Sequence, residues 1–191
     1  MNARYPSTSK THPSHSLAAK MRKGSARFTQ TIAIAIACIA LPSTGFALDT
    51  GDRAPDFAAP SLMDGAPVEL SEYRGKVVYL DFWASWCGPC LKAIPEVEEM
   101  RAEFPESEFQ IIAVNLDQKK KKALRFLKKN PIGYPSASDP EGELPGQFGL
   151  ETMPTSYLID EDGVIRYVHR GFKKGDGSKL RHEIRSLLGM K

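Results

Sequence analysis

Cysteine and histidine are scarce in this chain, and their scarcity restricts the chemistry that it can support. The 191 residues include three cysteines and four histidines. Cys87 and Cys90 form a pair with two residues between them. A structural zinc site needs four ligands, and residues 48–191 contain no second cysteine or histidine pair to complete one. Redox chemistry between the two thiols is therefore a better interpretation of the pair than half of a zinc site.

The first 47 residues contain no acidic residue, although they contain six basic ones. Their apolar run, Ile32–Leu41, is short, since a membrane-spanning helix takes roughly 20 apolar residues. Gly45 and Ala47 place small residues at positions −3 and −1 before Leu48. This combination is typical of an export signal.

We therefore predict a signal peptide or N-terminal membrane segment over residues 1–47 and a folded domain over residues 48–191. Cleavage before Leu48 is the preferred interpretation, and a retained anchor is the alternative. Cys38 lies in a poor context for lipid attachment, so we interpret it as an apolar filler of the signal. The predicted location is the periplasm.

The folded domain lacks the basic excess that is typical of nucleic-acid-binding proteins. The whole chain has a formal charge of +3, but residues 48–191 carry 20 basic and 23 acidic residues. We therefore expect no nucleic-acid partner.

The motif Trp86–Cys90 stands between an apolar run and a helix-like stretch. Free backbone N–H groups and the dipole of a helix N-terminus stabilise a thiolate there. Cys87 is accordingly predicted to be the exposed nucleophile, and Cys90 the buried resolving thiol. Pro89 suits the start of a helix because its missing N–H would have no partner within the helix. A purely structural disulfide is the alternative.

The remaining pattern predicts a mixed α/β domain with one sheet and no internal repeat. We expect strands over residues 68–70, 77–82, 109–116, 155–159 and 164–168, and helices over residues 90–103, 119–129 and from 178 onward. Asp117 and Ser178 are expected to cap the last two helices, and residues 134–150 to be rich in loops. The lysine run Lys119–Lys122 is interpreted as a solvated helix face, with a site for an acidic partner as the alternative.

Two groups of residues resemble known families. Residues 80–90 resemble the active-site strand and helix of thioredoxin almost residue for residue, and Pro95 and residues 153–155 also match. The arm Ala54–Phe57, the helix over residues 119–129 and residues 158–163 are similar to the exported TlpA/ResA-type branch of that superfamily.

The resemblance implies a thioredoxin fold, with a mixed central sheet flanked by helices, an N-terminal arm and an inserted β-α element. It implies a monomeric thiol-disulfide oxidoreductase that reduces protein disulfides and needs no cofactor beyond its own Cys87–Cys90 disulfide. Electrons are expected from a membrane thiol transporter of the DsbD/CcdA type. Cytochrome c maturation or oxidase assembly is the expected context.

The resemblance also assigns roles to single residues. Pro154 matches the family's cis-proline beside the dithiol, where the backbone of Met153 can pair with an extended substrate segment. An ordinary trans proline is the alternative. Asp81 matches a buried carboxyl that exchanges protons with the resolving cysteine, and its alternative is a structural, hydrogen-bonded aspartate. Ala113 stands where thioredoxin has a lysine partner for this aspartate.

Packing and support beside the dithiol are expected from four residues: Trp83, Trp86, Gly88 and Pro89.

Two other functions compete with this interpretation. A thiol peroxidase needs a proline and a threonine or serine at −7 and −3 from the attacking cysteine, but Leu80 and Ala84 stand there. Copper delivery would use Cys87, Cys90 and His169 as soft ligands. His169 is more simply interpreted as a surface residue, so we predict no metal site.

Overall fold

The structure is a computed structural model that describes residues 47–190. The predicted export signal, with Cys38, lies outside these residues except for Ala47. The elements in chain order are β1 (Ala58–Pro60), β2 (Pro67–Glu69), the 3-10 helix η1 (Leu70–Tyr73), β3 (Val77–Trp83), α1 (Gly88–Glu103), β4 (Phe109–Asn115), α2 (Lys120–Leu127), β5 (Ser136–Ser138), α3 (Glu143–Phe148), β6 (Thr155–Ile159), β7 (Ile165–Arg170) and α4 (Asp176–Leu187). Within this described part, no helix is long and apolar enough to cross a membrane.

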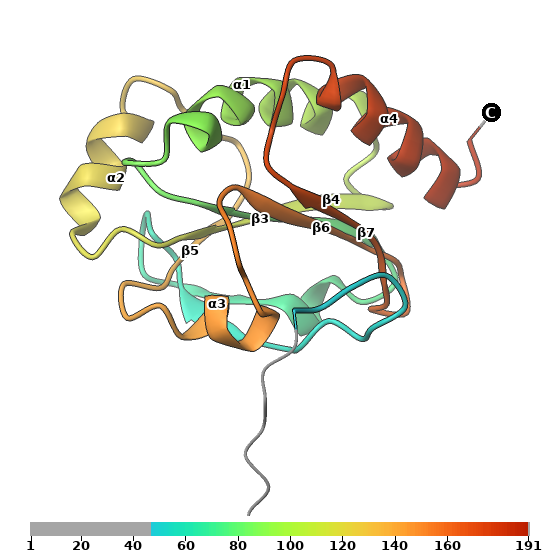
Figure 1. The fold of residues 1–191 in the computed structure, drawn as a ribbon, viewed down its shortest axis with the longest axis horizontal. Coiled ribbons are helices and arrows are strands. Elements are labelled where there is room, and N and C mark those ends of the chain that lie inside the picture. The colour runs from blue at the N-terminus through green and yellow to red at the C-terminus, as the bar shows by residue number, and fades with distance from the viewer. Residues whose placement is uncertain (1–46, 191) are drawn as a thin grey trace, which may run out of the picture. The chain divides into compact units, whose positions relative to one another are not determined.

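A five-stranded mixed sheet forms the centre of the domain, in the order β5-β4-β3-β6-β7 (Figure 1). Strand β3 pairs in parallel with β4 and antiparallel with β6. Every residue of β3 is buried, as its continuous apolar run predicted. The mixed α/β fold expected from the sequence is therefore confirmed.

Helices cover both faces of this sheet (Figure 1). Helices α1, α2 and α4 share a core with one face, while α3 and the N-terminal arm pack on the other. Successive strand side chains point to opposite faces, so Tyr79 and Trp83 face α1, whereas Leu80 and Phe82 face α3. Asp81, midway between Tyr79 and Trp83, therefore lies on the α1 face.

The N-terminal arm is a small β1–β2 hairpin beside the sheet. Isolated bridges tie Arg53 to Val164 and Ser61 to Ala137, so the arm contacts both the β6–β7 hairpin and strand β5. Phe57 contributes its ring to the core on the α3 face.

Strand β5 and helix α3 lie within residues 134–150, the segment that was predicted to be rich in loops. Strand β5 extends the sheet beside β4 and ends at Ser138. The Asp139 carboxylate then accepts the backbone N–H groups of Glu143 and Leu144, at 3.1 and 2.9 Å, at the start of α3. Both elements are too short to give a clear periodic signal, which explains why the prediction for residues 134–150 included neither of them.

Two predicted helix caps are also wrong. Helix α2 starts after Lys119 without a side-chain cap, because the carboxylate of Asp117 bonds to Ser85 instead. Helix α4 begins at Asp176, after Gly175 with φ 99°, so that Ser178 lies inside the helix. The N–H of Lys173 donates to the Asp176 carboxylate at 2.7 Å and fixes this turn.

Candidate active site

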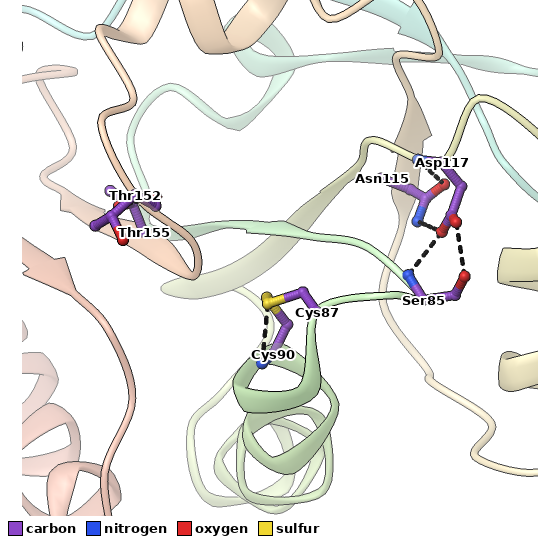
Figure 2. The surroundings of a disulfide bond; sticks show 7 residues. All are labelled: Ser85, Cys87, Cys90, Asn115, Asp117, Thr152 and Thr155. Carbon is purple, nitrogen blue, oxygen red and sulfur yellow. Dashed lines mark hydrogen bonds between the residues drawn. A yellow bond between two sulfur atoms is a disulfide. The ribbon is translucent and has the colours of Figure 1, made fainter.

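The Cys87–Cys90 disulfide lies where the chain passes from β3 into α1 (Figure 2). The two Cα atoms are 5.3 Å apart. After Trp83 the chain makes a short turn, closed by a 3.0 Å hydrogen bond from the Cys87 N–H to the Ala84 carbonyl. Cys87 is then the N-cap residue of α1. The helix begins at Gly88, two residues earlier than predicted, so Cys90 lies in its first turn and Cys87 immediately precedes it.

The first turn of α1 points a backbone donor at the Cys87 sulfur. The N–H of Cys90 donates to Cys87 Sγ at 3.3 Å. Pro89 lies in the first two helical positions, where its missing N–H costs no helical hydrogen bond. This donor and the partial positive charge of the helix N-terminus both favour negative charge on Cys87 Sγ when the disulfide is reduced.

The exposure of the site differs from the prediction. Cys87 is only 5% exposed in the disulfide form and Cys90 is 0% exposed. The prediction of an exposed Cys87 is therefore wrong for this state, because the bond to Cys90 draws its sulfur into the core on the α1 face. Trp86, expected to pack beside the site, is 63% exposed, whereas Trp83 is buried as expected.

Gly88 and Pro89 form an exposed edge directly after Cys87. A Cβ atom at Gly88 would have no neighbour within 4 Å, so packing within the domain does not require glycine there. The open space leaves room for another chain to approach the sulfur closely.

Asp81 is buried on the same face of the sheet as the two cysteines. Its side chain is opposite Ala113 on β4 and Ser156 on β6, and neither residue supplies a charge. Burial raises the pKa of Asp81 to about 8. The carboxyl is thus largely protonated at neutral pH and titrates in the range where thiols exchange protons.

Two buried tyrosines respond to the same carboxyl. Burial raises the pKa of Tyr79 and of Tyr134, and the negative charge of Asp81 raises both further. These phenols therefore stay protonated and do not compete with Asp81 as a base.

The loop that leads into β6 contains Thr152 and lies on the opposite side of the disulfide from Ser85 and Asp117 (Figure 2). Its Met153–Pro154 peptide bond is cis. The Thr155 hydroxyl donates to the Thr152 carbonyl at 2.8 Å, and the Gly171 N–H donates to the Pro154 carbonyl at 2.7 Å. Met153 packs against the core cluster that contains both cysteines. The backbone around Met153 is thus held beside the dithiol.

A polar clamp that the sequence analysis missed holds the turn before Cys87 (Figure 2). Asp117 accepts the Ser85 N–H at 2.7 Å and the Ser85 hydroxyl at 2.6 Å. The Asn115 side chain donates to the same carboxylate at 2.9 Å, and the Leu116 N–H donates to the Trp83 carbonyl at 3.0 Å. The available signal was a pair of polar residues, Asn115 and Asp117, at the end of an apolar strand.

The structure does not bring His169 together with the cysteines. Its Nε2 atom lies 2.7 Å from the Glu183 carboxylate, and its side chain is 12% exposed, so the prediction of a surface residue is wrong. The pairing register of β6 and β7 explains this burial, because it places His169 opposite Ser156, on the face of the sheet that α4 covers. Burial lowers the pKa of His169, although Glu183 opposes the shift. Among residues 47–190, no three His, Cys, Asp or Glu side chains gather as a metal site requires.

The positions that a thiol peroxidase would need are filled by apolar side chains. Leu80 and Ala84 are both 0% exposed, and Leu80 faces the α3 side of the sheet, away from the disulfide. Neither has a hydroxyl group that can bind a peroxide beside Cys87.

Comparisons with known proteins agree with this site. The model of the redoxin family matches residues 49–184. Thiol-disulfide oxidoreductase ResA of Bacillus thuringiensis subsp. konkukian is 36% identical over 118 residues, which are 62% of this chain and 68% of that protein.

Solved structures of thiol-disulfide exchange proteins are also similar to this chain. A protein described as thiol:disulfide interchange protein DsbE, from Chlorobium tepidum, superposes with a TM-score of 0.71 and 46% identity, over 75% of this chain and 100% of the other. A protein described as a protein disulfide isomerase, from Bacteroides thetaiotaomicron, gives a TM-score of 0.66 and 31% identity, over 75% and 95% of the two chains.

A thioredoxin fold with a dithiol at the start of α1 defines a thiol-disulfide oxidoreductase. The chain belongs to the redoxin family, and within it the chain is similar to the ResA and DsbE proteins.

The raised pKa of Asp81 predicts how stability depends on pH. The unfolded chain loses this proton near pH 4, but the folded protein retains it up to about pH 8. The folded state thus binds more protons across this window, and the free energy of unfolding should fall as the pH rises. In Asp81→Asn this contribution is absent. The free energy of unfolding of the variant should therefore rise relative to that of the wild type by a few kcal/mol between about pH 4 and pH 8. Urea unfolding of both oxidised proteins measures the difference, and parallel pH profiles would contradict the assigned ionisation.

Proposed function

We propose that this protein is exported and reduces disulfide bonds in other proteins through Cys87 and Cys90. The observation that carries the proposal is the position of Cys87 Sγ, 3.3 Å from the Cys90 N–H at the start of α1, with Cys90 wholly buried behind it. Cys87 adjoins the exposed edge of Gly88 and Pro89, so we infer that a substrate reaches its sulfur, whereas only an intramolecular step can use the sulfur of Cys90. The residues between the cysteines, Gly88 and Pro89, resemble those of reducing thioredoxins.

The reaction consists of two exchange steps. The Cys87 thiolate attacks one sulfur of the substrate disulfide, forming a mixed disulfide and releasing the other substrate sulfur as a thiolate, which takes up a proton. Cys90, after losing its proton, then attacks Cys87 Sγ and releases the second substrate thiol. The substrate gains two electrons and two protons, and the protein is left with the Cys87–Cys90 disulfide.

Asp81 serves the second step in this proposal. The Cys90 thiol is buried, so it must transfer its proton to a nearby base before it can attack. Asp81 lies behind the start of α1 on the same face of the sheet, and its pKa of about 8 matches that of a thiol. The carboxylate can take the Cys90 proton directly or through one water.

The substrate is proposed to lie across the exposed edge formed by Trp86, Gly88 and Pro89 and to pair with the backbone at Met153. The hydrogen bonds that hold this loop, from Thr155 to Thr152 and from Gly171 to Pro154, support this arrangement, since an extended segment can bind there through main-chain hydrogen bonds as an added strand does.

The proposed function also includes a location for the protein and a source of electrons. Removal of residues 1–47 as an export signal would place a monomeric domain in the periplasm. There a membrane thiol transporter of the DsbD/CcdA type would return the disulfide to two thiols. Similarity to ResA and DsbE proteins supports a role in cytochrome c maturation or oxidase assembly.

Trapping of a mixed disulfide tests which cysteine attacks. Reduced Cys90→Ser, mixed with a peptide that contains one disulfide, should accumulate a covalent adduct through Cys87 because no thiol remains to resolve it. Cys87→Ser is the matched control and should form little adduct, since its remaining thiol is buried. Intact mass spectrometry with peptide mapping measures both, and preferential trapping by Cys87→Ser would reverse the assigned roles.

The proton-transfer role of Asp81 predicts a selective kinetic defect. Asp81→Asn should slow resolution of the mixed disulfide by about tenfold or more between pH 6 and 9, while the first attack by Cys87 changes little. Stopped-flow tryptophan fluorescence of the wild type separates the two phases, with Cys90→Ser reporting the first step alone. Equal slowing of both phases, or of neither, would make Asp81 a purely structural residue.

A further inference from the structure

The segment that contains α2 has a charge opposite to that of the rest of the domain. Between residues 119 and 129 it carries seven basic residues and no acidic one, whereas the rest of residues 48–191 has 13 basic and 23 acidic residues. All seven basic side chains are exposed. Within residues 47–190, none of them forms an ion pair.

This charge does not help α2 to form. Lysines fill the N-terminal turn of the helix, where the dipole disfavours positive charge, and the turn has neither an acidic residue nor a side-chain cap. Lys122 and Arg125 are also three residues apart, a spacing at which like charges repel along a helix. These basic residues lower the stability of the helix that contains them, and they lie beside the active site. Their charge therefore indicates a function in contacts with another molecule.

The basic side chains of one face of α2 adjoin the active site through Trp86. Trp86 precedes Cys87 and is 63% exposed. A hollow of about 450 Å³ lies between Trp86 and the pair Lys119 and Lys122. A second hollow, of about 400 Å³, lies between Trp86 and the residues Lys122, Arg125 and Lys129. These five residues, Trp86 with four basic ones, are called the Trp86–α2 surface below.

We propose that the Trp86–α2 surface binds an acidic segment next to the disulfide of the substrate protein. The proposal rests on the proposed function and identifies which substrates that function favours. Carboxylates of the segment lie in the two hollows against the four basic side chains, and its apolar atoms cover the Trp86 ring. The segment then places the neighbouring disulfide at Cys87.

The energetic effect is expected mainly in the rate of association. Exposed charges of opposite sign steer a partner toward the site and raise the association rate constant, whereas the net strength of each exposed ion pair is small. Salt screens this steering over about 10 Å at 0.1 M ionic strength. The preference for acidic substrates should therefore decline as salt is added.

Two peptides test the proposal with the full-length protein in its dithiol form. Both contain the same disulfide loop, flanked by four glutamates in one peptide and four glutamines in the other. Stopped-flow fluorescence gives the second-order rate constant for reduction of each. The acidic peptide should react about tenfold or more faster at low salt, and the advantage should nearly vanish at about 0.5 M salt.

A matched pair of charge reversals locates the effect. Lys122→Glu/Arg125→Glu should abolish the preference for the acidic peptide while leaving the rate with the glutamine peptide within about twofold. Lys121→Glu/Lys128→Glu makes the same change in net charge in the same basic segment, at exposed residues that line neither hollow. This control should retain most of the preference.

The outcomes separate the failure of the two proposals. If the wild-type dithiol reduces neither peptide, the proposed reductase function fails. If it reduces both at equal rates, or if both double variants lose the preference equally, docking at the Trp86–α2 surface is overturned. Sedimentation with phosphatidylglycerol vesicles tests the other acidic occupant. Binding that Lys122→Glu/Arg125→Glu removes, combined with equal peptide rates, would make this a membrane surface.

Discussion

The site depends above all on the way in which the buried strand β3 delivers the chain to the first turn of α1. Strand β3 is hydrogen-bonded on both sides and covered on both faces, so its end is fixed. The Asp117 clamp on Ser85 and the bond from Leu116 to the Trp83 carbonyl restrain the short turn that follows. Cys87 and Cys90 consequently meet at the first turn of α1, where the Cys90 N–H faces Cys87 Sγ. Because both sulfurs are held by one rigid element, the resolving step is intramolecular, and a good geometry for it needs no further ordering.

Two carboxyl groups are buried near this junction in different surroundings. Asp117 accepts three hydrogen bonds from Ser85 and Asn115, which compensates its burial and makes it a structural clamp. Asp81 lies opposite Ala113 and Ser156, with no cation across the strands, and burial raises its pKa to about 8. An uncompensated carboxyl in a core costs folding free energy. The proton transfer proposed for Asp81 would give that cost a function, since the same burial gives the carboxyl an affinity for protons close to that of a thiol.

The sequence predicts the centre of the domain well, because those features are local. The apolar run of β3, the dithiol spacing and Pro89 together predict a buried strand, a helix start and a redox pair. What it could not predict depends on contacts between distant segments. Asp117 has the position of a helix cap in the sequence, and only the parallel pairing of β3 with β4 brings it to Ser85. His169 looks like a surface residue until α4 covers it. The element β5–α3 is too short and too rich in glycine and proline to predict, and it is stabilised by the sheet edge and by Asp139.

The reduction potential of the Cys87–Cys90 pair tests the central claim most directly. Equilibration with glutathione or dithiothreitol buffers at pH 7, followed by quantification of the free thiols, gives the value. If the protein is the reductant proposed above, its Gly88-Pro89 pair, which resembles that of thioredoxins, predicts a potential near that of thioredoxin, roughly −270 mV. A potential near that of DsbA, about −120 mV, would mean that the dithiol form is strongly favoured and that the protein works as an oxidant, which would contradict the account.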